Sequence, residues 1–163
     1  MKTDDMSNVT GLPVNPAHLA AACDLWRSEG RFIWATIHGG SMTPTILPGQ
    51  KIQLHFTHSG LKPGQIIAYQ RDERIVVHRL IAIDGDPATG AAQYVCLGDG
   101  NAANDAPVRL QDIAGLVTKV APAPFLRRVV LAVAHPRRHL RFFLRRAAMG
   151  PCPPIPRELG SPG

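Results

Sequence analysis

The sequence of 163 residues lacks any apolar run approaching the roughly 20 residues that a membrane-spanning helix requires. Its first residues, MKTDDMSNVTGLPVNP, contain early acids and no apolar stretch, so they do not form a secretory signal. Cysteine is also scarce. The three cysteines, Cys23, Cys96 and Cys152, are widely spaced, which fits neither a disulfide framework nor a zinc site.

Acidic residues are nearly missing from the C-terminal end. Residues 125–163 hold eight Arg and one Glu, whereas residues 1–124 hold ten Lys or Arg and eleven Asp or Glu. Residues 125–148 place apolar side chains on one helical face and arginines largely off it. This pattern predicts a basic amphipathic helix, broken or kinked at Pro136, and residues 149–163 are Pro- and Gly-rich and predicted to be disordered.

A basic amphipathic helix can lie among lipid headgroups, so peripheral contact with an anionic membrane is one expectation for this segment. Packing on the rest of the protein with a solvated basic face is the alternative. Nucleic acid is less favoured, because no interleaved aromatic residues offer a stacking platform. We therefore expect a protein that is peripherally membrane-associated or cytoplasmic.

The middle of the chain is predicted to be mostly antiparallel β. A helix is expected from Pro16 to about residue 29, with Asn15 as its N-cap and Gly30 as its end. Strands are then expected at residues 31–39, 50–56, 64–70, 74–84, 92–98 and 112–121. The predicted organisation is a flexible leader at 1–15, a β domain with an N-terminal helix at 16–122, and the basic helix and tail at 123–163.

Three stretches carry residues that are typical of acyl-transfer chemistry. GGSMTPTILPGQ places Ser41 on a bend, IVVHRL places His78 inside a strand, and LGDGNAANDAP places Asp99 and Asp105 in a polar loop. Each alone is explained by ordinary structure: a turn, a core or edge histidine, and acids that satisfy backbone donors. Together they supply a nucleophile, a base and a group to orient the base. Histidine suits the base because its unperturbed pKa is about 6.5.

GSMTPTILPGQ, LKPGQIIAY, IVVHRLI, LGDGNAAND and IAGLVTKV resemble, in this order, the sequence boxes of the signal peptidase I family. The resemblance covers about residues 33–120 and implies a serine endopeptidase related in fold to the self-cleaving repressor peptidases. Bacterial members use a lysine as general base. Here His78 stands at that place, and Lys51 and Lys62 fall in other boxes, which is typical of the endoplasmic-reticulum, archaeal and sporulating-bacterial branch.

The resemblance also implies a role for each matching residue. Ser41 would be the nucleophile, His78 the general base and Asp105 the residue that orients the base, with Asp99 as a loop organiser or alternative partner. Arg79, beside the base, is expected to form a salt bridge or face solvent.

Gly40 and Met42 flank the nucleophile and are the candidates for substrate or oxyanion contacts. The family often has a small hydroxyl residue two places before the nucleophile, where this chain has Gly39. An oxyanion hole would therefore depend on backbone N–H groups, including that of Ser41.

The expected function is cleavage of signal or leader peptides after small residues, with the peptide bound as an extended strand at a sheet edge. One alternative is a non-catalytic peptide-binding module of the same fold. Another is a soluble peptidase that trims leaders or cleaves itself. No cofactor is expected, and His55 and His58 lack a third ligand that would make them a metal site.

Overall fold

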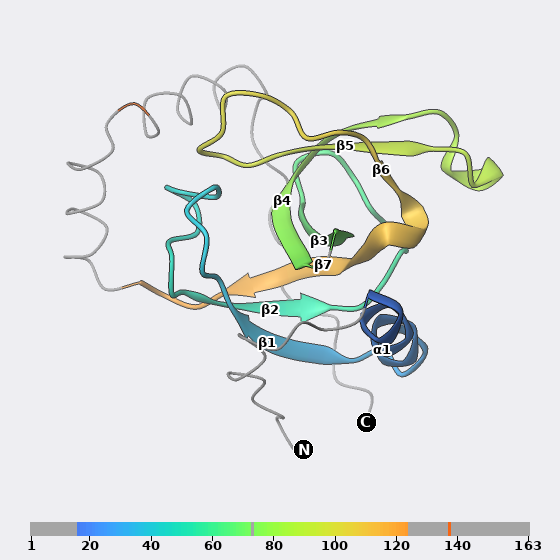
Figure 1. Ribbon diagram of the computed structural model, residues 1–163, viewed down its shortest axis with the longest axis horizontal. Helices are drawn as coiled ribbons and strands as arrows, with labels where there is room; N and C mark the ends of the chain where they lie inside the picture. Colours follow the sequence, from blue (N-terminus) through green and yellow to red (C-terminus); the bar gives the residue numbers. More distant parts are fainter. Residues whose placement is uncertain (1–15, 73, 124–136, 138–163) are drawn as a thin grey trace.

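The computed structural model describes residues 16–72, 74–123 and 137 (Figure 1). Within these residues the chain forms one α-helix, seven strands and two short 3-10 helices. They are α1 (Pro16–Ser28), β1 (Phe32–Thr36), β2 (Lys51–His55), β3 (Ile66–Arg71), β4 (Arg74–Asp84), η1 (Pro87–Thr89), β5 (Gln93–Leu97), β6 (Val108–Arg109), η2 (Leu110–Asp112) and β7 (Ile113–Val120).

The strands form one sheet in the order β1-β2-β7-β3-β4-β5-β6, and every neighbouring pair is antiparallel. The sheet coils strongly: β4 crosses the direction of β1, β2 and β7 in Figure 1. Irregular register between β2 and β7, β3 and β7, and β4 and β5 marks the bulges that increase local twist. Where β7 pairs with β2, a Cβ on Gly115 would lie 2.1 Å from the carbonyl oxygen of His55, so only glycine allows the two strands to approach this closely.

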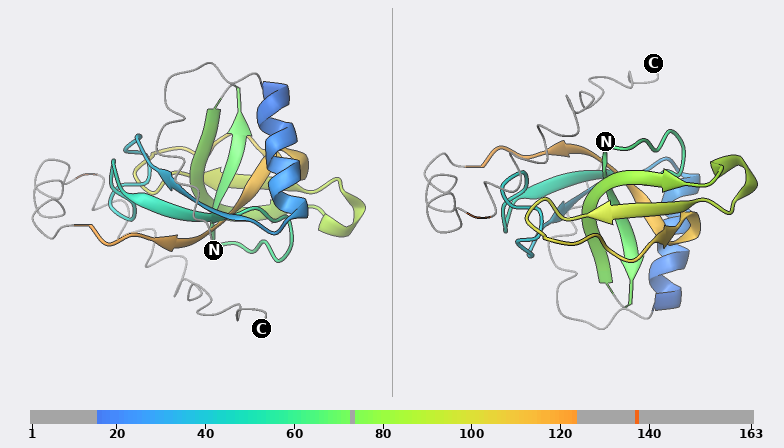
Figure 2. Two further views of the ribbon diagram at one scale, coloured as in Figure 1. Left: turned by 90° about the horizontal axis from the view of Figure 1, so that it is seen from below. Right: turned by 90° about the horizontal axis from the view of Figure 1, so that it is seen from above.

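The core divides into two apolar clusters. The first is covered by α1 (Figure 2). From this helix Leu19, Cys23 and Trp26 join a cluster that includes Leu54 and Phe56, and the centroid of the Trp26 ring lies 4.9 Å from that of Phe56. The second lies among β3, β4, β5 and β7. Its buried members are Ile67, Tyr69, Leu80, Ala92, Tyr94, Cys96, Val108 and Ile113. The period of two along β3 explains the division, because Ile66 and Ala68 join the first cluster while Ile67 and Tyr69 join the second.

The prediction of a mostly antiparallel β protein with one short N-terminal helix is confirmed for the described residues. Gly30 follows α1 with a φ of 59° and donates its N–H to Arg27, as expected of a helix end. Strand β6 was not predicted, because two residues after Pro107 are too short to show an alternating pattern. The predicted leader at 1–15 and basic helix at 125–148 lie outside the described residues, apart from Arg137.

No helix within the described residues is long and apolar enough to cross a membrane.

Candidate active site

The loop between β1 and β2 carries Ser41. Short-range backbone bonds fold it tightly: Thr43 donates its N–H to the Gly40 carbonyl at 3.1 Å, and Ile46 donates to the Met42 carbonyl at 3.0 Å. The side chains of Met42 and Ile46 are 1% and 0% exposed and belong to the first apolar cluster. These buried anchors hold the loop against the sheet and leave Ser41 partly exposed. Because the Met42 side chain is buried, only the backbone of this residue can face a substrate.

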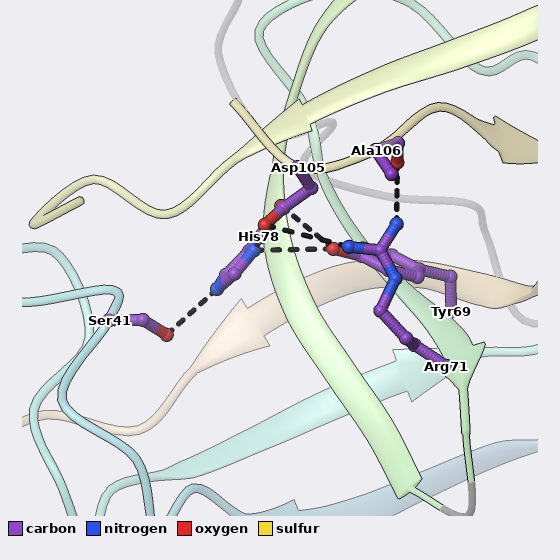
Figure 3. A network of polar contacts seen from close by, with 6 residues as sticks. All are labelled: Ser41, Tyr69, Arg71, His78, Asp105 and Ala106. Carbon is purple, nitrogen blue, oxygen red and sulfur yellow. Dashed lines mark hydrogen bonds and ion pairs between the residues drawn. The ribbon is translucent and has the colours of Figure 1, made fainter. Parts of the chain in front are cut away.

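His78 lies on β4, and its imidazole connects two residues that are far apart in sequence. It pairs with Ile67 in the sheet and is 5% exposed. Its Nε2 atom lies 2.8 Å from Ser41 Oγ, and its Nδ1 atom lies 2.5 Å from Asp105 Oδ2. Figure 3 shows the ring between the hydroxyl and the carboxylate. The structure therefore brings the predicted nucleophile, base and orienting acid into one hydrogen-bonded chain.

The loop after β5 delivers Asp105 to this site. Asp105 donates its N–H to the Cys96 carbonyl at 2.9 Å. This bond brings the end of the loop back beside β5, the strand from which the loop starts. Near its start the loop contacts the segment that carries Ser41, since Gly100 donates its N–H to the Ser41 carbonyl at 2.7 Å. A Cβ on Gly98 would lie only 2.7 Å from that same carbonyl oxygen. The glycine thus lets the acidic loop pack directly against the serine loop.

Asp99, the other acid of this loop, has a different partner. The Arg79 guanidinium donates to both of its carboxylate oxygens, at 2.8 and 2.7 Å, and also to the Gly64 carbonyl at 2.6 Å. Asp99 also accepts a hydrogen bond from the hydroxyl of Thr45, in the loop that carries Ser41. Asp99 and Arg79 are both buried. Asp99 was predicted to be either a loop organiser or an alternative partner of the histidine, and its contacts match the first role. Arg79 was predicted either to form a salt bridge or to face solvent, and it forms the salt bridge.

The hydrogen-bond partners decide which nitrogen of His78 carries a proton. An ionised carboxylate only accepts, so the Nδ1 atom facing Asp105 must donate. The Nε2 lone pair then faces Ser41 Oγ and can accept the hydroxyl proton. This is the arrangement that activates a serine for attack on a carbonyl carbon.

Two further residues of this network were missed by sequence reasoning. Tyr69 donates its hydroxyl proton to Asp105 Oδ2 at 2.8 Å, and Arg71 Nη1 lies 3.8 Å from Asp105 Oδ1. Both come from β3, near the tip of the hairpin that joins β3 to β4. That tip pairs Arg71 with Arg74 and therefore Tyr69 with Val76, diagonal to His78 on the same face.

The remaining residues named in the sequence analysis take no part in the hydrogen-bonded chain from Ser41 to Asp105. The His55 ring stacks on Phe32 with centroids 4.2 Å apart, and His58 Nε2 lies 2.7 Å from the Ile113 carbonyl oxygen, so the two imidazoles face different partners. Gly39 is exposed, and a Cβ there would meet no atom within 4 Å. Cys23 and Cys96 are buried free thiols, as small core residues would be.

These contacts define a Ser–His–Asp hydrogen-bonded site on an antiparallel β domain. No protein-family model matches the chain, and a search of curated proteins finds no match either. The resemblance to signal peptidase I therefore stands on the residues of this chain alone.

Proposed function

We propose that this protein is a serine endopeptidase of the signal peptidase type, in the branch that uses a serine and a histidine. It would cleave signal or leader peptides after small residues. The observation that carries the proposal is the chain of hydrogen bonds from Ser41 Oγ through His78 to Asp105, with steps of 2.8 and 2.5 Å. Three residues from a loop, a strand and a second loop converge in the order that acyl transfer requires.

In the first half of the reaction, Ser41 Oγ attacks the scissile carbonyl carbon while its proton passes to His78 Nε2. Asp105 keeps the imidazole in the required tautomer and offsets the positive charge that forms on it. Backbone N–H groups around Gly40 and Ser41 would bind the oxyanion of the tetrahedral intermediate.

Collapse of this intermediate breaks the C–N bond and transfers the proton from Nε2 to the departing amine, which leaves an acyl-serine. In the second half, water attacks the acyl carbon and gives its proton to His78 Nε2. The ester bond then breaks, and the proton returns to Ser41 Oγ. Each half thus uses the same imidazole first as base and then as acid.

The sheet offers a place for the peptide. Strand β1 stands at one end of the strand order, so one of its edges is unpaired by the described strands. It runs into the loop that carries Ser41. A peptide that adds to this edge as a further strand would be led along the backbone toward the nucleophile, since strand addition aligns a peptide by main-chain hydrogen bonds.

The test is cleavage of a peptide library with small residues before the scissile bond, using wild type, Ser41→Ala and His78→Ala. Wild type should cut a subset of the peptides. Each substitution should lower kcat by about 10³-fold or more, because the nucleophile or its base is lost. Products are identified by mass spectrometry, and circular dichroism checks that the variants fold.

Cleavage by Ser41→Ala at the wild-type rate would show that Ser41 is not the nucleophile. Peptides that bind to wild type but are never cut would instead favour the non-catalytic module. Isothermal titration with the same peptides separates these outcomes, because it measures binding without turnover.

A further inference from the structure

Tyr69 is a buried residue whose hydroxyl contacts the candidate site. Its side chain is 0% exposed and sits in the second apolar cluster, two positions along β3 from the residue that pairs with His78. A tyrosine in such a cluster brings a hydroxyl that must find a partner, because an unsatisfied buried polar group is costly.

That hydroxyl points into the His78–Asp105 contact. It lies 2.8 Å from Asp105 Oδ2 and 3.3 Å from His78 Nδ1 (Figure 3). The phenol ring also stands edge-on to the imidazole, with centroids 6.2 Å apart and planes at 68°. The tyrosine therefore borders both the carboxylate and the ring that the carboxylate orients.

Two donors converge on one oxygen. Asp105 Oδ2 receives the Tyr69 hydroxyl proton and the Nδ1 proton of His78, so the position of this oxygen is determined from two directions. Burial raises the pKa of Tyr69, and the hydrogen bond to Asp105 raises it further. The phenol thus keeps its proton at neutral pH and remains a donor.

Arg71 restrains the other half of the carboxylate. Its Nη1 atom lies 3.8 Å from Asp105 Oδ1, and its Nη2 atom donates to the Ala106 carbonyl. The guanidinium also lies 5.3 Å from the centre of the Tyr69 ring. Tyr69 and Arg71 thus hold the two carboxylate oxygens and the backbone next to them from a single strand.

We propose that Tyr69 is a positioning residue of the hydrolytic site: by donating to Asp105 Oδ2 it fixes the carboxylate that orients His78, and Arg71 supports it from the other oxygen. This inference rests on the proposed endopeptidase function. It assigns Tyr69 no contact with the substrate or with the reacting atoms.

The test is Tyr69→Phe in the full chain, which removes one oxygen and keeps the ring. With a peptide that wild type cleaves, kcat should fall about 10- to 100-fold, the size of loss that is typical when a group orienting a metal-ligating histidine is removed. KM should stay within about twofold, because Tyr69 does not hold the peptide. Tyr94→Phe is the matched control: Tyr94 is a tyrosine of the same apolar cluster, 2% exposed, on β5. It should keep wild-type kcat.

A second measurement needs no substrate. Proton NMR of the full chain should show a far-downfield signal from the His78 Nδ1 proton, which is held against a carboxylate. The signal is assigned by its loss in His78→Gln. In Tyr69→Phe it should shift or broaden through exchange with water, and in Tyr94→Phe it should stay in place.

The outcomes separate the two claims. Cleavage by wild type together with unchanged kcat in Tyr69→Phe overturns the role of Tyr69 and leaves the endopeptidase intact. An unchanged downfield signal in Tyr69→Phe overturns that role as well. Cleavage by Ser41→Ala at the wild-type rate overturns the proposed function itself. The inference is supported if Tyr69→Phe lowers kcat, leaves KM unchanged and shifts the downfield signal, while Tyr94→Phe changes none of the three.

Discussion

The two acids of the loop after β5 serve two neighbouring residues of β4 in opposite ways. Asp105 contacts His78, whose imidazole can gain and lose a proton, whereas Asp99 is bound at both oxygens by Arg79, whose charge is permanent. Because consecutive strand residues point to opposite faces of a sheet, His78 and Arg79 reach these acids from different sides. One loop therefore completes both a site suited to proton transfer and a fixed ion pair.

The contrast between the two acids suggests how the loop that carries them is held in place. Thr45 connects the Arg79–Asp99 pair to the loop that carries Ser41, and His78 connects Asp105 to the same loop through Ser41. A fixed ion pair can anchor a loop without taking part in chemistry. We infer that Asp99 acts on stability and Asp105 on rate, and the following predictions test this division.

The largest effect is expected for Asp105→Asn. An amide in place of the carboxylate can stabilise the wrong tautomer of His78, and kcat for peptide cleavage should fall by about 10⁴-fold. The midpoint of urea unfolding should change much less than for the Asp99 variant described next. Steady-state kinetics and urea denaturation measure the two quantities. A large loss of stability with little loss of kcat would reverse the roles assigned to the two acids.

Asp99→Asn should act mainly on folding. It leaves the buried Arg79 charge without its carboxylate, which typically costs about 3–5 kcal/mol. Urea unfolding followed by circular dichroism measures the loss. Asp112→Asn is the control, because its ion pair with Arg109 is solvent-exposed and such pairs contribute about 0–1 kcal/mol. Equal losses in the two variants would contradict the anchoring role of Asp99.

The smallest expected effect is a pH dependence of stability, which arises from two histidines outside the Asp105–His78 and Asp99–Arg79 contacts. Burial lowers the pKa of His55 and His58 in the folded protein, and the bond of His58 to the Ile113 carbonyl only partly opposes this. Between the folded and unfolded pKa values the unfolded chain binds more protons. Stability should therefore be full above about pH 6.5, the usual histidine value, and decline as the pH falls below it.

Urea midpoints at several pH values between neutral and mildly acidic conditions test this expectation. His58→Gln should flatten the decline, because it removes one of the two histidines that resist protonation. A decline of unchanged steepness in this variant would contradict the assignment of the pH dependence to His58.

Much of the fold could be predicted because its strands show their pattern locally. Residues 74–84 were expected as one strand and form β4 with those bounds. The expected strand at 31–39 is shorter in the structure, where β1 ends at Thr36 and the following residues enter the serine loop. A strand ends where its hydrogen bonds to the neighbouring strand end, and the strand's own residues do not show that position.

The candidate site divides in the same way. Ser41, His78 and Asp105 were recognisable because glycines, a β-branched strand and a polar loop make such residues stand out. Tyr69 and Arg71 were not, because a tyrosine and an arginine in a strand have many ordinary uses. Their contact with Asp105 arises from the pairing of β3 with β4 and from the return of the loop after β5.

The residue pattern alone was enough to predict a mostly β chain and to single out a serine, a histidine and two acids as the candidate site. Which of the two acids contacts the histidine became clear from the three-dimensional arrangement of the strands and loops. Asp99 and Asp105 lie in one short loop, where residue type and spacing leave both within reach of β4. The choice follows from the alternation of side chains along β4, which aims His78 at Asp105 and Arg79 at Asp99.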